Sequence, residues 1–242
     1  MNNISIYLTG HKGYIGSKLL KHLEMLGANV QTCDLKAGQD VISHEPKERV
    51  EVVYHLAAQS GVPESTSDPI NDARQNILGT LKAIEIANKN KAKLIFTTSG
   101  ASLKPESPYG LSKKTCEDYI KMLCKDYVIL RLSSVYGHKP KGVVDNFVRD
   151  NTCVVYGDGS ARRDFVHVDD IIMALLKAKN WKRGTYLCGS GKGTTIAQIA
   201  EATGKPVDYQ KKRKGDKDDV VLKNTTPDWR PSIDVITWIK QQ

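Results

Sequence analysis

The sequence predicts an α/β protein with a doubly wound parallel sheet and a small C-terminal lobe, and two observations carry this prediction. Short apolar runs rich in β-branched residues alternate five times with segments whose apolar residues recur at helical spacing. The apolar runs contain few polar residues, which is typical of strands buried on both faces of a sheet. We expect one domain over residues 1–150 and a small α/β lobe over residues 151–242. Whether a helix expected over 168–179 packs back on the sheet of the first domain stays open.

The first strand leads directly into a glycine-rich turn and then into a helix. The mainly apolar run over residues 4–8 is followed by three spaced glycines, Gly10, Gly13 and Gly16. Glycine permits a positive φ and lets a ligand or a neighbouring helix approach the backbone closely. Unpaired N–H groups at the start of the helix would point at one place, which suits a pyrophosphate. A glycine-rich turn that binds no ligand can have the same sequence. The neighbouring segments therefore have to distinguish between these two possibilities.

The next segment supplies that context. A second strand over residues 29–33 ends in Asp34, about 20 residues further on, where a carboxylate accepts hydrogen bonds from the ribose of an adenine dinucleotide. The connection after it contains Asp40 and Val41, which either hold and cover an adenine ring or form an ordinary turn. We therefore predict a dinucleotide-binding site on a Rossmann-type sheet.

The rest of the chain continues the alternation. A strand over 52–56 ends beside Ala57 and Ala58, which either leave room for a ligand at the carboxyl end of the sheet or permit close helix packing. The further elements expected in the first domain are an amphipathic helix over 68–88, a strand over 93–99, a helix over 109–125 and a strand over 128–132. The elements expected in the lobe are a strand over 154–157, a helix over 168–179, a strand over 184–188 and a helix over 195–202 capped by Thr194 or Thr195.

The composition excludes several classes of protein. The chain has 242 residues, 40% of them hydrophobic, and contains neither a run of about 18 apolar residues nor a charged-then-apolar start, so we expect a cytoplasmic protein without a membrane partner. The net charge of +9 is compatible with nucleic acid or with an anionic small ligand. Because no helix-turn-helix, zinc-finger or stacking pattern is present, we expect no nucleic-acid partner. The five scattered cysteines form no CxxC pair, so we expect buried thiols and no metal site.

Tyr109 and Lys113 place a phenol and an ammonium four residues apart, on one face of an expected helix. A tyrosine with an ordinary pKa near 10 is a poor base at neutral pH. A neighbouring cation and a positively charged nicotinamide ring would favour the phenolate and make Tyr109 a usable general base. Surface pairs have the same spacing. The position after a strand that ends in Ser99, in a chain that opens with a dinucleotide turn, favours the catalytic interpretation.

Several sequence blocks in a fixed order carry a resemblance that spans nearly the whole chain. The blocks are Thr9-Gly10-x-x-Gly13-x-x-Gly16, His55-Leu56-Ala57-Ala58, Asn76-Ile77-x-Gly79-Thr80, Ser99, Tyr109-x-x-x-Lys113, Arg131-x-x-Ser134-Val135-Tyr136-Gly137, Tyr156-Gly157-Asp158-Gly159-x-x-Arg162-Arg163-Asp164-Phe165-Val166-His167-Val168-Asp169-Asp170 and Arg213-Lys214-Gly215-Asp216. In these blocks the chain resembles the extended short-chain dehydrogenase/reductases, specifically the NAD-dependent nucleotide-sugar epimerase/dehydratase family.

The resemblance implies NAD as the cofactor, a nucleoside-diphosphate sugar as the substrate and a substrate-binding C-terminal lobe. It assigns Tyr109 as the base, Lys113 to the nicotinamide ribose and to lowering the pKa of Tyr109, and Ser99 to the reacting sugar hydroxyl. The implied cofactor-binding residues are Gly10, Gly13, Tyr14, Ile15, Gly16, Asp34, Asp40, Val41, Leu56, Ala57, Ala58, Asn76, Tyr109 and Lys113. The implied substrate-binding residues are Ser99, Tyr109, Ser134, Tyr156, Arg163 and Arg213.

Two further expectations follow from the same resemblance. The two arginines in the substrate set, Arg163 and Arg213, would clamp a diphosphate with their planar guanidinium groups, or else form ion pairs at helix ends. The segments 68–88 and 109–125 resemble helices that pair in a dimer interface in this family, so we expect a homodimer.

The residues after Ser99 argue against one class of reaction, the loss of water from the sugar. The related 4,6-dehydratases need an Asp-Glu pair just after the active hydroxyl, whereas Gly100, Ala101 and Ser102 follow Ser99 here. The leading hypothesis is epimerisation at C4 of a UDP-hexose such as UDP-glucose, through a transient 4-keto intermediate. Asp34 favours NAD over NADP, because a carboxylate there repels a 2′-phosphate.

Two alternatives stay open. A nucleotide-sugar keto-reductase, or another epimerase of the same family, would use the same residues. A catalytically idle nucleotide-binding subunit is suggested by Ser134, where the family usually has asparagine, and by the shortened connection from Ser99 to Tyr109.

Overall fold

The computed structural model describes residues 3–138, 141–212 and 219–242, and it divides into two compact units. The first unit comprises residues 1–131 and 175–186, and the second comprises residues 132–174 and 187–242. The division falls after Arg131, earlier than residue 150, because strand β6 (Ser134–Tyr136) pairs with β9 (Phe165–His167) inside the second unit.

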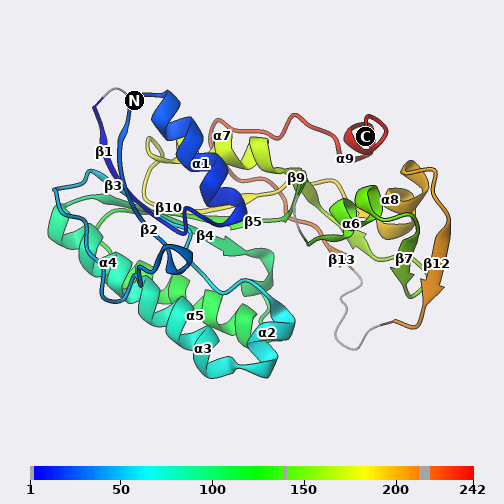
Figure 1. Cartoon of the computed structure of the whole chain (residues 1–242), viewed down its shortest axis with the longest axis horizontal. Coiled ribbons are helices and arrows are strands. Elements are labelled where there is room, and N and C mark those ends of the chain that lie inside the picture. The colour runs from blue at the N-terminus through cyan, green and yellow to red at the C-terminus, as the bar shows by residue number, and fades with distance from the viewer. Residues whose placement is uncertain (1–2, 139–140, 213–218) are drawn as a thin grey trace. The chain divides into compact units, whose positions relative to one another are not determined.

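The first unit is built on a six-stranded sheet with the strand order β10-β5-β4-β3-β1-β2 (Figure 1). The strands are β1 (Ser5–Thr9), β2 (Asn29–Cys33), β3 (Val52–His55), β4 (Lys93–Ser99), β5 (Tyr127–Leu132) and β10 (Gly184–Cys188). β1 pairs in parallel with both β2 and β3, and β3 pairs in parallel with β4. The chain therefore moves to one side of β1 for β2 and to the other side for β3. This reversal makes the gap between β1 and β3 the switch point, where such sheets bind ligands.

Helices lie on both faces of this sheet. α1 (Tyr14–Met25) lies on one face, and α4 (Gly79–Asn90) and α5 (Pro108–Leu123) lie on the other (Figure 1). Strand residues that point toward α4 and α5 form one buried cluster with them, and these are Tyr7, Val53, Leu94, Phe96 and Ile129. The strand residues between them, such as Ile6, Leu8 and Tyr54, are equally buried. The strands are apolar on both sides for this reason.

The amphipathic helix predicted over 68–88 is interrupted in the structure. It consists of α3 (Pro69–Ala73), a π-helical turn over Arg74–Leu78 and α4, and a short α2 (Val62–Ser67) precedes it. A π turn adds one residue to one turn of helix, so the apolar spacing on either side still reads as helical. Two 3₁₀ turns, η1 (Leu35–Ala37) and η3 (Gly100–Ser102), follow β2 and β4.

The second unit consists of small sheets and short helices. β6 pairs in parallel with β9, β7 (Cys153–Tyr156) pairs with β12 (Val207–Gln210), and β8 (Arg162–Arg163) lies between β11 (Thr194–Thr195) and β13 (Asp219–Val220). The helices are α6 (Val143–Arg149), α8 (Ile196–Ala202) and α9 (Val235–Ile239). α7 (Val168–Ala178) continues into the first unit, where the Tyr54 hydroxyl donates to the carbonyl of Leu175 at 3.2 Å.

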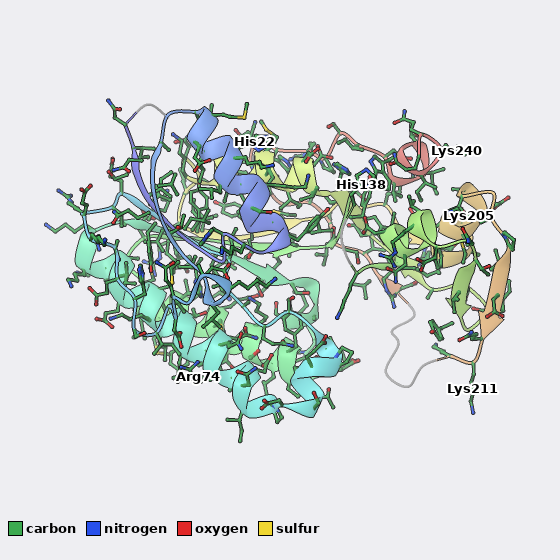
Figure 2. The ribbon with its side chains drawn as sticks, viewed as in Figure 1. His22, Arg74, His138, Lys205, Lys211 and Lys240 are labelled. Atoms are coloured by element: carbon green, nitrogen blue, oxygen red, sulfur yellow. The ribbon has the colours of Figure 1, made fainter. Side chains whose placement is uncertain are left out.

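Helix ends in the second unit are capped by side chains. Thr195 caps α8, as predicted, through a reciprocal pair of hydrogen bonds with Gln198 at 3.1 and 2.9 Å. Lys205 (Figure 2) donates from Nζ to three carbonyl groups at the end of α6, including those of Phe147 at 3.0 Å and Asp150 at 2.9 Å. An ammonium placed there satisfies carbonyls that have no partner within the helix.

Candidate active site

The glycine turn lies at the switch point between β1 and β3. Gly10 has a φ of 78°, and a Cβ atom there would lie 2.6 Å from the backbone nitrogen of Ala57 after β3. A Cβ atom on Gly16 would lie 2.1 Å from the carbonyl oxygen of Gly10, so α1 begins directly against the turn. No side chain caps the start of α1 at Gly13. The turn therefore exposes backbone N–H groups that no side chain covers, and this arrangement fits the pyrophosphate of a dinucleotide.

Asp34 is held in place where β2 ends. Its carboxylate accepts the N–H of Lys12, in the glycine turn, and the N–H of Lys36, in η1, both at 2.8 Å. A carboxylate has about four acceptor positions, so both oxygens can still accept hydrogen bonds from ribose hydroxyls. The predicted spacing from the glycines to Asp34 thus corresponds to a direct hydrogen bond between the turn and this carboxylate.

Asp40 and Val41, predicted to lie beside the adenine, are engaged with other parts of the first unit. Asp40 accepts the N–H of Ile42 at 3.0 Å and forms an ion pair with Arg74 (Figure 2) at 2.6 Å. The backbone hydrogen bond first, and the ion pair second, hold the pKa of Asp40 below its usual range. Val41 is buried in the core that α4 covers. Both side chains therefore fix the connection after β2.

Asn76, in the π turn, joins three segments. It is 1% exposed, and its side-chain oxygen accepts the N–H of Gln59 at 2.9 Å. Its side-chain nitrogen donates to Asp72 and to Ser112, both at 3.0 Å. Asn76 therefore fixes the loop over residues 56–59, which contains the predicted Leu56, Ala57 and Ala58, and its own amide is bonded to protein groups.

His55 is the last residue of β3 and is 1% exposed. Its two ring nitrogens lie 2.8 Å from the hydroxyl of Thr9 and 3.2 Å from the hydroxyl of Thr80. Burial, with a smaller contribution from the positive charge of Lys113, lowers the pKa of His55 to about 3. The ring is therefore neutral at neutral pH and ties β1 and β3 to α4.

The start of α5 places the tyrosine and the lysine. The Ser107 hydroxyl accepts the N–H of Gly110 at 3.1 Å and so caps the helix, which begins at Pro108. Tyr109 consequently lies in the first turn, and its own N–H donates to the hydroxyl of Ser65 at 3.1 Å. The local sequence Ser-Pro, a cap followed by proline, is typical of a helix start.

Lys113 lies one turn further along α5 and is 4% exposed. Its Nζ donates to the carbonyl of Thr97 in β4 at 3.2 Å and lies 4.7 Å from the centre of the Phe96 ring. Burial lowers the pKa of Lys113. An ammonium has three donors, so two remain for a ligand at this place.

Ser99 completes the group at the carboxyl end of β4. Its hydroxyl accepts the N–H of Ala101 at 3.2 Å. Burial raises the pKa of Tyr109 to about 12, although a side-chain hydrogen bond from Ser99 acts in the opposite direction. The spacing to Lys113 alone predicts a lowered pKa for Tyr109. The protein's own groups raise it instead, because desolvation of the phenolate outweighs the groups that favour it.

A cavity of about 730 Å³ lies within the second unit. Three of the predicted substrate-binding residues line it, namely Ser134, Tyr156 and Arg163. Arg213 lies outside the described residues. Volumes of about 300 to 1,000 Å³ are usual for small-molecule sites, so the cavity is large enough for a nucleotide.

Other residues that line the cavity were not predicted from the sequence. α6, which was not predicted, contributes Val143, Asn146 and Phe147 to the cavity. A signal was present, because the apolar residues at 143, 144, 147 and 148 recur at helical spacing. Lys212 also lines the cavity, so the lining includes two cationic side chains, Lys212 and Arg163, and two carboxylates, Asp150 and Asp158.

The described ranges, 3–138, 141–212 and 219–242, contain no metal site, disulfide or membrane-spanning helix. No group of three or more His, Cys, Asp or Glu side chains in them is placed to hold a metal ion. All five cysteines are buried free thiols. None of the described helices is long and apolar enough to cross a membrane.

The switch-point cradle and the neighbouring phenol, ammonium and hydroxyl define the class of protein, an α/β enzyme that works with a dinucleotide cofactor. Comparison with known proteins gives the family. Residues 6–189 match the NAD dependent epimerase/dehydratase family, and the chain belongs to it.

Individual relatives agree with this assignment. The chain is 32% identical to a putative UDP-glucose 4-epimerase of Methanocaldococcus jannaschii, over 96% of this chain and 88% of that protein. The solved structure of UDP-glucose 4-epimerase from Thermotoga maritima with UDP-glucose has a TM-score of 0.85 and 28% identity, and covers 98% of this chain and 96% of that one. For the Thermus thermophilus UDP-glucose 4-epimerase complex with NAD, the TM-score is 0.80, the identity 28% and the coverage 98% and 97%. The predicted Rossmann-type fold, family, NAD cofactor and enzyme class are confirmed.

Proposed function

We propose that the protein epimerises a nucleoside-diphosphate sugar, at C4 of a UDP-hexose. The observation that carries the proposal is the group of Tyr109, Lys113 and Ser99, which is followed by a turn without an acid pair, Gly100–Ser102. Epimerisation requires a base at one sugar hydroxyl, whereas loss of water from the sugar also requires an acid at the leaving oxygen. The relatives named above are UDP-glucose 4-epimerases, which supports the same reaction.

Tyr109 is the proposed base. NAD, when bound, supplies a two-electron acceptor and donor for C4 of the sugar, and its nicotinamide ring is positively charged in the oxidised state. That charge and the ammonium of Lys113 one turn away favour the phenolate, against the burial that raises the pKa of Tyr109. Tyr109 then removes the proton of the C4 hydroxyl and later returns it. The hydroxyl of Ser99 holds the C4 oxygen in line with the phenol.

The remaining predicted residues are proposed to bind the cofactor and the nucleotide. The backbone of Gly10, Gly13, Tyr14, Ile15 and Gly16 takes the pyrophosphate, Asp34 takes the adenosine ribose, and the connection that contains Asp40 and Val41 borders the adenine. Leu56, Ala57 and Ala58 border the cofactor. Asn76 fixes their loop through the hydrogen bond from the N–H of Gln59. The cavity of the second unit takes the nucleoside diphosphate, with Arg163 on a phosphate and Ser134 and Tyr156 as further contacts. Arg213 is retained as a diphosphate ligand on the sequence resemblance alone.

A homodimer is proposed through the two helical segments 68–88 and 109–125. Both segments expose large apolar side chains that a monomer would leave in water, and these are Ile70, Leu78, Leu111, Tyr119 and Met122, each 36% to 81% exposed. A second copy of the same surface would bury them. Light scattering that gives the mass of a single chain at micromolar concentration would contradict this part.

The test of the reaction uses the purified chain and UDP-galactose. We expect UDP-glucose to form without net consumption of reduced cofactor, and we expect Tyr109→Phe to lower kcat by about 10³-fold. Tyr209→Phe, which alters an exposed tyrosine of β12 outside the proposed interface, is the control and should retain full activity. Steady loss of absorbance from reduced cofactor when a 4-keto nucleotide sugar is supplied in place of UDP-galactose would instead identify a keto-sugar reductase. Unchanged sugar with cofactor bound would identify an idle subunit.

A further inference from the structure

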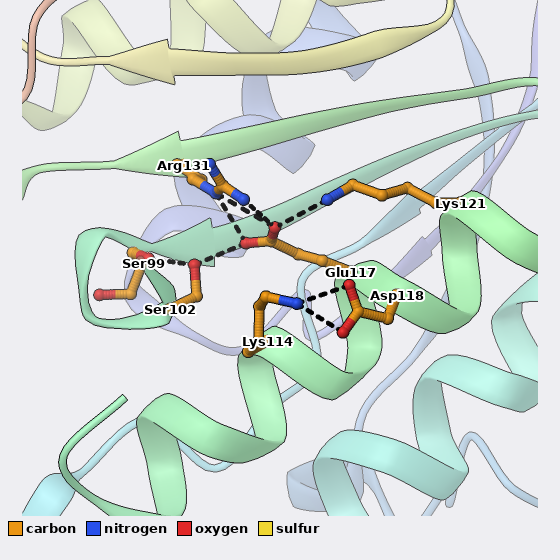
Figure 3. A network of polar contacts seen from close by, with 7 residues as sticks. All are labelled: Ser99, Ser102, Lys114, Glu117, Asp118, Lys121 and Arg131. Carbon is orange, nitrogen blue, oxygen red and sulfur yellow. Dashed lines mark hydrogen bonds and ion pairs between the residues drawn. The ribbon is translucent and has the colours of Figure 1, made fainter. Parts of the chain in front are cut away.

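Glu117 is a fully buried carboxylate in α5 that the proposed mechanism does not use. It lies four residues after Lys113 and eight after Tyr109, so all three share one face of the helix. Its carboxylate accepts hydrogen bonds from Arg131 of β5, with Nε at 2.9 and 3.1 Å and Nη2 at 2.5 Å (Figure 3). The Nζ of Lys121 lies 3.5 Å away.

The pairing fixes both the charge and the position of Glu117. Burial by itself would raise the pKa of Glu117, but hydrogen bonds from Arg131 and from the hydroxyl of Ser102 outweigh it and hold the pKa below its usual range. A buried charge is costly unless it is paired and hydrogen-bonded on all sides. The forked guanidinium therefore leaves the carboxylate one favourable position.

Ser102 connects Glu117 to the turn that follows Ser99. The Ser102 hydroxyl is buried, 2.6 Å from Oε1 of Glu117 and 2.8 Å from the carbonyl oxygen of Ser99. A hydroxyl has one proton, and the nearer and charged oxygen of Glu117 is the stronger acceptor. Ala101, in the same turn, donates its N–H to the Ser99 hydroxyl at 3.2 Å. A continuous chain of contacts thus leads from Arg131 to the Ser99 hydroxyl.

The same turn also contacts the beginning of α5. A Cβ atom on Gly110 would lie 3.0 Å from the carbonyl oxygen of Ala101, closer than ordinary contacts of this kind. The turn over Gly100–Ser102 is therefore held at two places on α5. One is next to Tyr109, and the other is Glu117, two helical turns further on.

A second ion pair one residue away on α5 shows what a surface pair looks like. Lys114 and Asp118 are 2.6 Å apart, and their side chains are 39% and 49% exposed (Figure 3). Exposed pairs of this spacing contribute little to structure. Asp118 therefore provides a control for the loss of a carboxylate from the same helix.

We propose that Glu117 is a positioning residue for the reaction proposed above, because through Ser102 it fixes the Ser99 hydroxyl where that group can bond Tyr109 and the sugar oxygen. The proposal depends on that proposed function. It differs from a purely structural role for the Glu117–Arg131 pair, which would not require the hydroxyl of Ser102.

Ser102→Ala tests the proposal most directly, because it removes the link to the turn and leaves the Glu117–Arg131 pair intact. We expect kcat for UDP-sugar epimerisation to fall about tenfold while KM changes less than about twofold, since a reacting group loses alignment but binding is retained. The melting temperature should stay close to that of the wild type. Glu117→Gln should lower kcat similarly and also lower the melting temperature, because it leaves Arg131 buried without its counter-charge. Asp118→Asn should change neither quantity.

A kcat for Ser102→Ala within twofold of the wild type would overturn the proposal. Hydrogen exchange of the backbone over residues 99–103 gives a readout that does not depend on sugar chemistry. If the wild-type chain converts no UDP-sugar, the proposed function fails, and exchange then decides the role of Glu117. Faster exchange in Ser102→Ala than in Asp118→Asn supports the positioning role, and equal rates overturn it.

Discussion

The polar groups of the two candidate sites, one in each unit, are held in different ways. In the first unit, Lys113 is 4% exposed, Asn76 is 1% exposed and Glu117 is fully buried, and each is hydrogen-bonded to groups on other elements. In the second unit, two exposed residues line the cavity, Ser134, the first residue of the three-residue strand β6, and Lys212, which follows the four-residue strand β12. Fixed groups suit a reaction that depends on alignment, and exposed groups suit recognition that can vary with the ligand. We infer that the first unit carries the chemistry and that the second selects the substrate.

The largest effect expected from this comparison is on a buried group of the first unit. Lys113→Met keeps the packing on the Phe96 ring but removes the ammonium one helical turn from Tyr109. We expect kcat/KM to fall about 10²-fold or more, because the phenolate loses a stabilising charge and the cofactor ribose loses a donor. Steady-state kinetics with UDP-galactose measures it.

The neighbouring surface residue provides the control for that prediction. Lys114→Met removes an ammonium from the exposed side of the same helix, where it pairs with Asp118. Its kcat/KM should stay within about twofold of the wild type. If both lysine variants lost activity equally, the net charge of α5 rather than the buried ammonium would explain the loss.

The same difference between the units explains what the sequence could predict. Gly10, Gly16 and Asp34 are recognisable because their proposed function follows from backbone geometry and a short spacing along the chain. Tyr109 and Lys113 are recognisable because one helical turn separates them. Each of these residues belongs to a strand, turn or helix that can be predicted from the local sequence, and their roles stay predictions.

Other residues were missed because their role depends on distant partners. Glu117 acquires its role only from Arg131 and Ser102, which lie 14 and 15 residues away in the chain. In the second unit, β8 has two residues and β6 has three, too few to show a period. The raised pKa of Tyr109 depends on burial, which no spacing reveals.

A smaller effect is expected on stability, again in the first unit. His55 has a pKa of about 3 in the folded protein, whereas an unfolded histidine titrates near 6.5. The unfolded state therefore binds a proton more readily, and the stability that neutral His55 contributes is complete above pH 6.5 and is lost as the pH falls toward 3. By pH 5 the loss is about 2 kcal/mol.

Urea unfolding at pH 7 and pH 5 measures this loss. His55→Gln, which cannot be protonated, should unfold with a smaller difference between the two pH values than the wild type. If the free energy of unfolding fell by the same amount between pH 7 and pH 5 in both proteins, a group other than His55 would cause the acid sensitivity. The buried ring of His55 would then contribute less to the stability of the first unit than we infer.

The smallest effect is expected in the second unit, and it tests whether that unit binds the substrate without taking part in the reaction. Arg163 lines the cavity, whereas its neighbour Arg162 is exposed and pairs with Asp219 at 2.7 Å. Arg163→Met should raise KM for the UDP-sugar about tenfold with kcat nearly unchanged, because a charge-assisted bond to the diphosphate is lost equally in the ground state and the transition state. Arg162→Met should leave both parameters within about twofold, since it disrupts only an exposed ion pair.

A fall in kcat for Arg163→Met at constant KM would instead assign alignment of the sugar to the second unit as well. The separation between a unit for chemistry and a unit for recognition would then be wrong.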